Sequence, residues 1–113
     1  MKSHILAAAI AASALFLSGS AQAYESLMKM PCSVADRHSP PVHMQDCLIR
    51  SSMAQGVVLW VVTTPDGRRF RIENDERNLN RWRVNGAAAK ETFNGTCYES
   101  RQVSVCAQGD SGF

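Results

Sequence analysis

The chain has 113 residues, 45% of them apolar, and its 12 Lys and Arg against 10 Asp and Glu leave a net charge of +2. This length and apolar content are typical of one small globular domain. They exclude a multidomain enzyme, a coiled coil and a strongly acidic disordered chain.

The first 23 residues have the pattern of a secretory signal peptide. Lys2 supplies a positive charge, residues 5–17 form an Ala-rich apolar run, and residues 21–23 (Ala-Gln-Ala) are typical of a cleavage site. As a helix the apolar run would span only about 20 Å, which is short of the roughly 30 Å hydrocarbon core of a bilayer. We therefore expect residues 24–113 to form a single exported domain, periplasmic or secreted, with no membrane span.

All four cysteines fall in this expected domain: Cys32, Cys47, Cys97 and Cys106. An even number of cysteines in a small exported chain predicts a disulfide framework, because so small a core is only marginally stable by itself. Four cysteines allow three pairings, and we favour the local pairs Cys32–Cys47 and Cys97–Cys106. By chain entropy, a bridge that closes a loop of about 15 residues contributes about 3 kcal/mol.

Residues 24–55 predict mostly irregular structure. Three prolines interrupt any helix there, and residues 33–41 have the composition of a loop. A short strand over residues 47–51 is the one regular element expected in this part of the chain.

Residues 56–73 predict a β-hairpin. Residues 56–63 carry five β-branched side chains and a tryptophan, which favours a buried strand. Residues 65–67 (Pro-Asp-Gly) are typical of a tight turn. Residues 68–73 then alternate, so that Phe70 and Ile72 are expected to face the core.

The rest of the chain carries further turn signals. Residues 74–80 predict a loop or one helical turn, and residues 81–84 alternate with Trp82 and Val84 on one side. Asn85-Gly86 is a strong hairpin signal, so residues 87–91 are expected to form a return strand, although their alanines favour a helix.

Near the end of the chain, Asn94-Gly95 marks another turn. A disulfide between Cys97 and Cys106 would then place a hairpin tip between Arg101 and Gln102. Residues 109–113 predict a frayed tail. Turns at this spacing, with no amphipathic helix between them, predict a mainly β domain: a small antiparallel β-barrel or curled sheet built from hairpins.

Six arginines fall within residues 68–83, and strand alternation places four of them on the outside of the sheet. These four are Arg69, Arg71, Arg81 and Arg83. On neighbouring strands their like charges would destabilise the sheet unless an anionic partner bound there, and guanidinium groups suit bidentate contacts to carboxylate or phosphate. We predict them as the binding residues of a non-catalytic binding or accessory protein. An envelope protein or an anionic polymer is the expected partner, nucleic acid is not, and a merely solvated strand face is the alternative.

Two other functions are weighed against this prediction. His38 and His43 have the residue type for acid–base chemistry in a small secreted hydrolase or nuclease. Together with Cys32 and Cys47 they also have the identities of metal ligands, but oxidation of an exported chain removes the thiolates that a metal would need. We expect no enzyme activity, cofactor or metal site.

A signal peptide, a short β-rich chain, a Pro-Asp-Gly-Arg turn at residues 65–68 and a late cysteine pair resemble the bacterial lysozyme inhibitors of the C-type-inhibitor barrel family. The resemblance implies a periplasmic barrel that binds a lysozyme. The inhibitory Ser and Lys motif of that family has no match here, and a basic surface opposes a basic lysozyme. A protein of this lysozyme-inhibitor-like kind is therefore an alternative.

Overall fold

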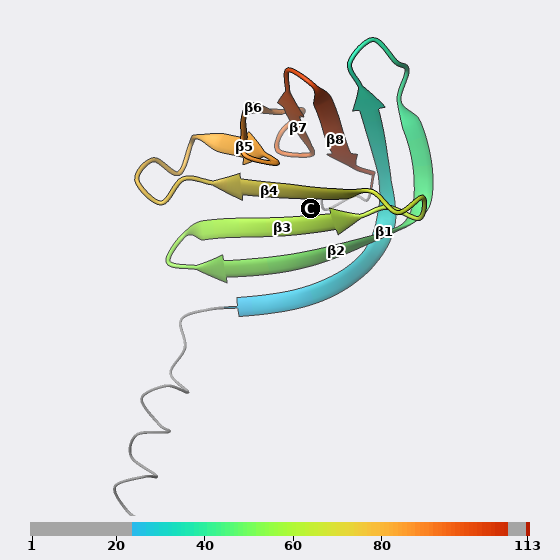
Figure 1. Ribbon diagram of the computed structural model, residues 1–113. Coiled ribbons are helices and arrows are strands. Elements are labelled where there is room, and N and C mark those ends of the chain that lie inside the picture. Colours follow the sequence, from blue (N-terminus) through green and yellow to red (C-terminus); the bar gives the residue numbers. More distant parts are fainter. Residues whose placement is uncertain (1–23, 109–112) are drawn as a thin grey trace, which may run out of the picture.

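The computed structural model describes residues 24–108 and 113, and these residues fold into a closed barrel of eight antiparallel strands. Each strand pairs with the next along the chain, and the last pairs with the first (Figure 1). The strands are β1 (Tyr24–Asp36), β2 (Val42–Ala54), β3 (Val57–Thr63), β4 (Arg69–Asn74), β5 (Trp82–Val84), β6 (Ala87–Thr92), β7 (Cys97–Ser100) and β8 (Val103–Ala107).

This architecture confirms the predicted antiparallel barrel, and both predicted disulfides, Cys32–Cys47 and Cys97–Cys106, are present. No helix long and apolar enough to cross a bilayer occurs in the described part of the chain. The predicted signal peptide, residues 1–23, and residues 109–112 of the predicted tail lie outside the described residues.

The prediction that residues 24–55 are mostly irregular is wrong. β1 and β2 are 13 residues long each and pair along most of their length. Pro31 fits within β1 because the strand needs only its carbonyl, which accepts a hydrogen bond from the Gln108 N–H at 2.9 Å. Pro40 and Pro41 fall in the turn that joins β1 to β2. The prolines therefore mark one turn and one strand position rather than a long loop.

A β-bulge places the first disulfide inside the barrel. The pairs Met30–Cys47 and Cys32–Met44 are two residues apart on β1 but three apart on β2. The extra residue lets Met44 and Cys47 point to the same side of β2. Cys32 and Cys47 are both 0% exposed, so this bridge is part of the core.

The later hairpins follow the predicted turn signals. Gly67 has φ +91°, and its N–H donates to the Thr64 carbonyl in the Pro-Asp-Gly turn. Asn85 and Gly86 both have positive φ, as the predicted two-residue hairpin turn requires, so turn chemistry outweighs the helix propensity of the alanines. A buried strand was expected over residues 56–63. β3 turns only one face inward, so Val62 is its one buried residue and the other six are partly exposed.

Aromatic rings fill one part of the barrel interior. Trp60 and Trp82 stack with ring centroids 5.5 Å apart and planes within 5°, and Tyr98 lies 4.6 Å from Trp82. Phe113 stacks on Trp60 at 5.5 Å, so this last residue is not frayed as predicted. The aliphatic core lies beside this cluster and contains Ile49, Val62, Ile72, Val84 and Val105.

Candidate functional site

The four predicted binding arginines lie on one region of the barrel. β4 and β5 are antiparallel neighbours with Glu73 opposite Arg83, which confirms the adjacency on which the prediction depended. Phe70 and Ile72 are buried, so Arg69 and Arg71 face outward from β4. Arg81 immediately precedes β5 and is exposed.

These arginines differ in how strongly neighbouring acids neutralise them. The Nε of Arg71 donates to Glu73 Oε2 at 2.6 Å, and Nη2 of Arg83 donates to Glu73 Oε1 at 3.2 Å. Nη1 of Arg83 also reaches Asp75 Oδ2 at 3.5 Å. Within residues 24–108, Arg69 and Arg81 form no ion pair. The face therefore keeps an excess of guanidinium charge, concentrated at Arg69 and Arg81.

The two acids of this network stay ionised at neutral pH. Partial burial acts to raise the pKa of Glu73, but hydrogen bonds and charge from Arg71 and Arg83 outweigh it and leave that pKa below its ordinary value. The pKa of Asp75 is lowered first by a hydrogen bond from the Arg77 N–H and further by Arg83. Both carboxylates are therefore charged when they pair with Arg83.

Two surface hollows flank Arg83. One, of about 430 Å³, is lined by Asp75, Asn80, Arg81, Trp82, Arg83, Gly86, Ala88 and Ala89. Gly86, Ala88 and Ala89 have small side chains that leave this space open, and Arg81 and Arg83 border it. The other, of about 420 Å³, is lined by Val57, Glu73, Asn74, Asp75, Glu76, Arg77 and Arg83, so acids dominate it. The first hollow is the better place for an anion.

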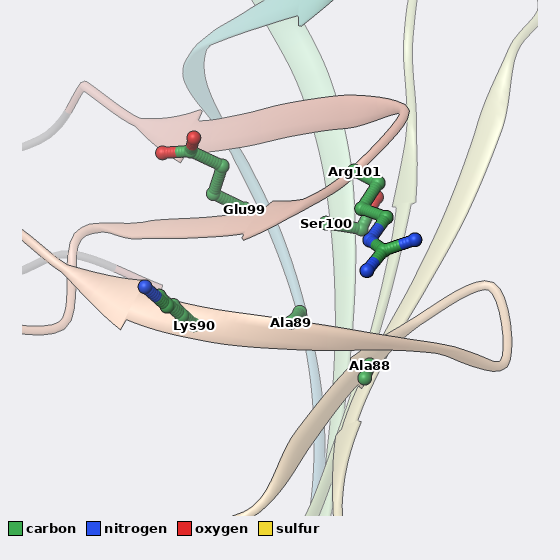
Figure 2. Close-up of a pocket in the computed structure, with 6 residues that line it drawn as sticks. All are labelled: Ala88, Ala89, Lys90, Glu99, Ser100 and Arg101. Atoms are coloured by element: carbon green, nitrogen blue, oxygen red, sulfur yellow. The ribbon is translucent and has the colours of Figure 1, made fainter.

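A third hollow extends the basic region across β6. Its volume is about 410 Å³, and it lies between β6 and the end of β7 (Figure 2). Figure 2 shows the Arg101 side chain extending from the β7–β8 turn toward Ala88 and Ala89, while Lys90 and Glu99 extend from the two strands farther along. Ala88 pairs with Arg83 on its other side. Arginines thus lie on both sides of an alanine-bearing strand.

Arg101 was not among the predicted binding residues. It lies in the turn between β7 and β8, and only the barrel topology places that turn beside β6. The isolated Ala87-Ala88-Ala89 run is the sequence signal that could have drawn attention to this place, because it leaves the first half of β6 without bulky side chains.

Another arginine, Arg68, forms an ion pair with Asp36 away from the arginine face. Arg68 donates two hydrogen bonds to the carboxylate of Asp36, at 2.9 and 2.7 Å, and lies 5.0 Å above the Phe70 ring. This bidentate contact lowers the pKa of Asp36. It also borders a hollow of about 420 Å³ that reaches Phe70, Val84 and Val103. Arg68 is neutralised there and does not add to the basic face.

The two histidines of the alternative hydrolase hypothesis are both exposed. His38 lies in the β1–β2 turn with φ +67°, and His43 lies on β2 with its Nδ1 2.9 Å from Gln108 Oε1. Neither lines the hollows described above. The hollows beside Arg81, Arg83 and Arg101, in contrast, border the predicted arginines.

The metal-ligand set considered in the sequence is not assembled. Cys32 and Cys47 are joined in a disulfide, and the other two cysteines are also oxidised, so no thiolate is present to bind a metal. Among residues 24–108 and 113, no group of three or more His, Cys, Asp and Glu side chains is placed to hold an ion.

No protein-family model, curated protein or solved structure gives a significant match to this chain.

Proposed function

We propose that this chain is an exported, non-catalytic binding protein that holds a carboxylate- or phosphate-bearing polymer, or an acidic segment of an envelope protein, across β5 and β6. The observation that carries this proposal is the arrangement of Arg81 and Arg83 on one side of Ala88 and Arg101 on the other. An extended anionic chain that crosses the alanines would meet guanidinium groups on both sides.

The chemistry of the face supports an anion rather than a neutral ligand. Arg81 has no described acidic partner, so a bound carboxylate or phosphate would provide the counter-charge that it lacks. Arg83 is already fixed by Glu73 and Asp75, which reduces the side-chain entropy lost on binding. Ala88 and Ala89 line the same hollow and add apolar contact area.

Export is the second part of the proposal. Two disulfides fit an oxidising compartment, and the N-terminal signal-peptide pattern supports the same location. Periplasmic or secreted localisation is tested by fractionating cells that express the full chain and by measuring the mass of the mature product. A product that retains residues 1–23 in the cytoplasm would contradict export.

Polyanion binding is tested by retention on immobilised polyglutamate and on a sulfated polysaccharide in a NaCl gradient. The variant R81Q/R101Q removes two face charges. The control R37Q/R50Q, matched in net charge, removes two exposed charges from the β1–β2 turn and from β2, where Arg50 pairs with Glu25 at 3.8 Å. We expect R81Q/R101Q to elute at clearly lower salt than the control, because its loss is local to the site. Equal elution of the two variants would mean that only net charge matters, and it would reject the site.

A further inference from the structure

The first half of β1 is an edge of the sheet that no described strand covers. β1 pairs with β2 from Tyr24 to Val34, but it pairs with β8 only from Cys32 to Asp36. Among the described residues, none pairs with the other edge of residues 24–30. Figure 1 shows this blue half of β1 as the lower border of the sheet, beyond β2. An uncovered edge presents a row of backbone donors and acceptors to another chain.

The position of Pro31 shows which backbone groups face this edge. Its carbonyl accepts the Gln108 N–H on the β8 side of β1. Backbone groups of successive residues in an antiparallel strand alternate between its two sides. The extra residue of the bulge lies on β2, so the alternation along β1 continues unbroken. Glu25, Leu27 and Lys29 therefore direct their N–H and C=O groups to the uncovered edge.

The side chains of this segment are self-complementary. In an antiparallel pairing of two copies centred on Leu27, each Glu25 lies opposite the Lys29 of the other copy. The two leucines meet on the two-fold axis between these charge pairs. Leu27 is 62% exposed in the single chain, so it has apolar surface to bury. Edge charges usually discourage pairing, but here one register converts both of them into attractive pairs.

We propose that the protein forms a homodimer through antiparallel pairing of residues 24–30 about a two-fold axis at Leu27. The pairing continues the sheet of one barrel into the sheet of the next, as an isologous contact between identical surfaces. This interface uses β1 alone, so it leaves the arginine face on β4, β5 and β6 uncovered. It is independent of the proposed anion binding.

Charge exchange across the axis tests the register. E25K and K29E each turn two attractive cross-strand pairs into two repulsive ones, and we expect each to raise the dimer dissociation constant roughly tenfold or more. The double variant E25K/K29E restores opposite charges and should return to within about threefold of the wild type. Sedimentation velocity of the protein expressed from its full chain measures all four constants.

The matched control exchanges charges between two facing residues on strands away from β1. Lys90 lies opposite Glu99 between β6 and β7, and both are exposed. K90E, E99K and their double variant should leave the dimer dissociation constant unchanged. L27D places two carboxylates at the axis and should give a monomer, while its circular dichroism and melting temperature show whether the exposed substitution preserves the fold. A monomeric wild type at millimolar concentration, or a dimer insensitive to these β1 variants, overturns the proposal.

Discussion

Replacement of Glu73 by glutamine should lower stability and strengthen polyanion binding at the same time. Glu73 neutralises Arg71 at 2.6 Å and Arg83 at 3.2 Å, and its side chain is 23% exposed. The Arg71 and Arg83 side chains are 61% and 35% exposed, so solvent screens both ion pairs. Pairs of this kind contribute about 0.5 kcal/mol each, so we expect a total loss of about 1 kcal/mol in the free energy of unfolding.

The pH dependence gives a second check on this loss. The pKa of Glu73 is lower in the folded chain than its ordinary value of 4.5. Its stabilising contribution is therefore complete above the unfolded pKa and disappears as the pH falls through the folded pKa. The difference in stability between the wild type and E73Q should be constant near pH 7 and should shrink in acid. Urea titrations across this pH range measure it.

Binding should move in the opposite direction, because E73Q frees the guanidinium group of Arg71 and leaves Arg83 with Asp75 as its one described acidic partner. Retention on immobilised polyglutamate should shift to higher salt than in the wild type. The control E76Q removes the same charge from the adjacent loop, where Glu76 is exposed and forms no described ion pair. If E73Q shifts elution no more than E76Q, the arginines of β4 and β5 are not the binding groups. If E73Q is as stable as the wild type, the ion pairs of Glu73 with Arg71 and Arg83 do not contribute to the free energy of unfolding.

Two further predictions concern the stability of the barrel. Asn74 is 5% exposed, and its side chain accepts a hydrogen bond from the Val58 N–H at 2.7 Å and donates to the Gly56 and Leu79 carbonyls at 3.3 Å each. N74A should therefore lower the free energy of unfolding, measured in urea, by about 2–3 kcal/mol, because these backbone groups lose their partners. A loss below about 0.5 kcal/mol would show that water replaces these bonds. The paired substitution C32A/C47A should destabilise the chain more than C97A/C106A. Chain entropy gives about 3 kcal/mol for a bridge between cysteines 15 residues apart and about 2.6 kcal/mol for 9 residues apart, and the first bridge is also fully buried. The reverse order in urea midpoints at matched m-values would contradict this reasoning.

Those parts of the fold that depend on residues close together in the chain could be predicted from the sequence. Asn85-Gly86 and Pro65-Asp66-Gly67 specify turn geometry by themselves, so the hairpins around them were predictable. The disulfides were predictable because each closes a local hairpin. In contrast, residues 32–36 of β1 pair with β8, about 70 residues away, and the prolines on either side of them hide the strand pattern.

The site was predictable only in outline, for a related reason. Alternation correctly placed Arg69 and Arg71 on the outside of β4. The pairing of Arg83 with Glu73 depends on the register of β4 and β5, which the seven-residue segment 75–81 sets. No short-range turn signal fixes the register across a segment of that length. The neutralisation of half the predicted face, and the contribution of Arg101, therefore became visible only with the folded barrel.

The order of the cysteines along the chain has a consequence for biogenesis. The first cysteine is joined to the second, Cys32 to Cys47, and the third to the fourth, Cys97 to Cys106. A thiol oxidase that meets the polypeptide as it emerges from a membrane pore would make these same linkages in order of arrival. If the chain is exported as proposed, its maturation requires an oxidant but no shuffling of mispaired sulfurs.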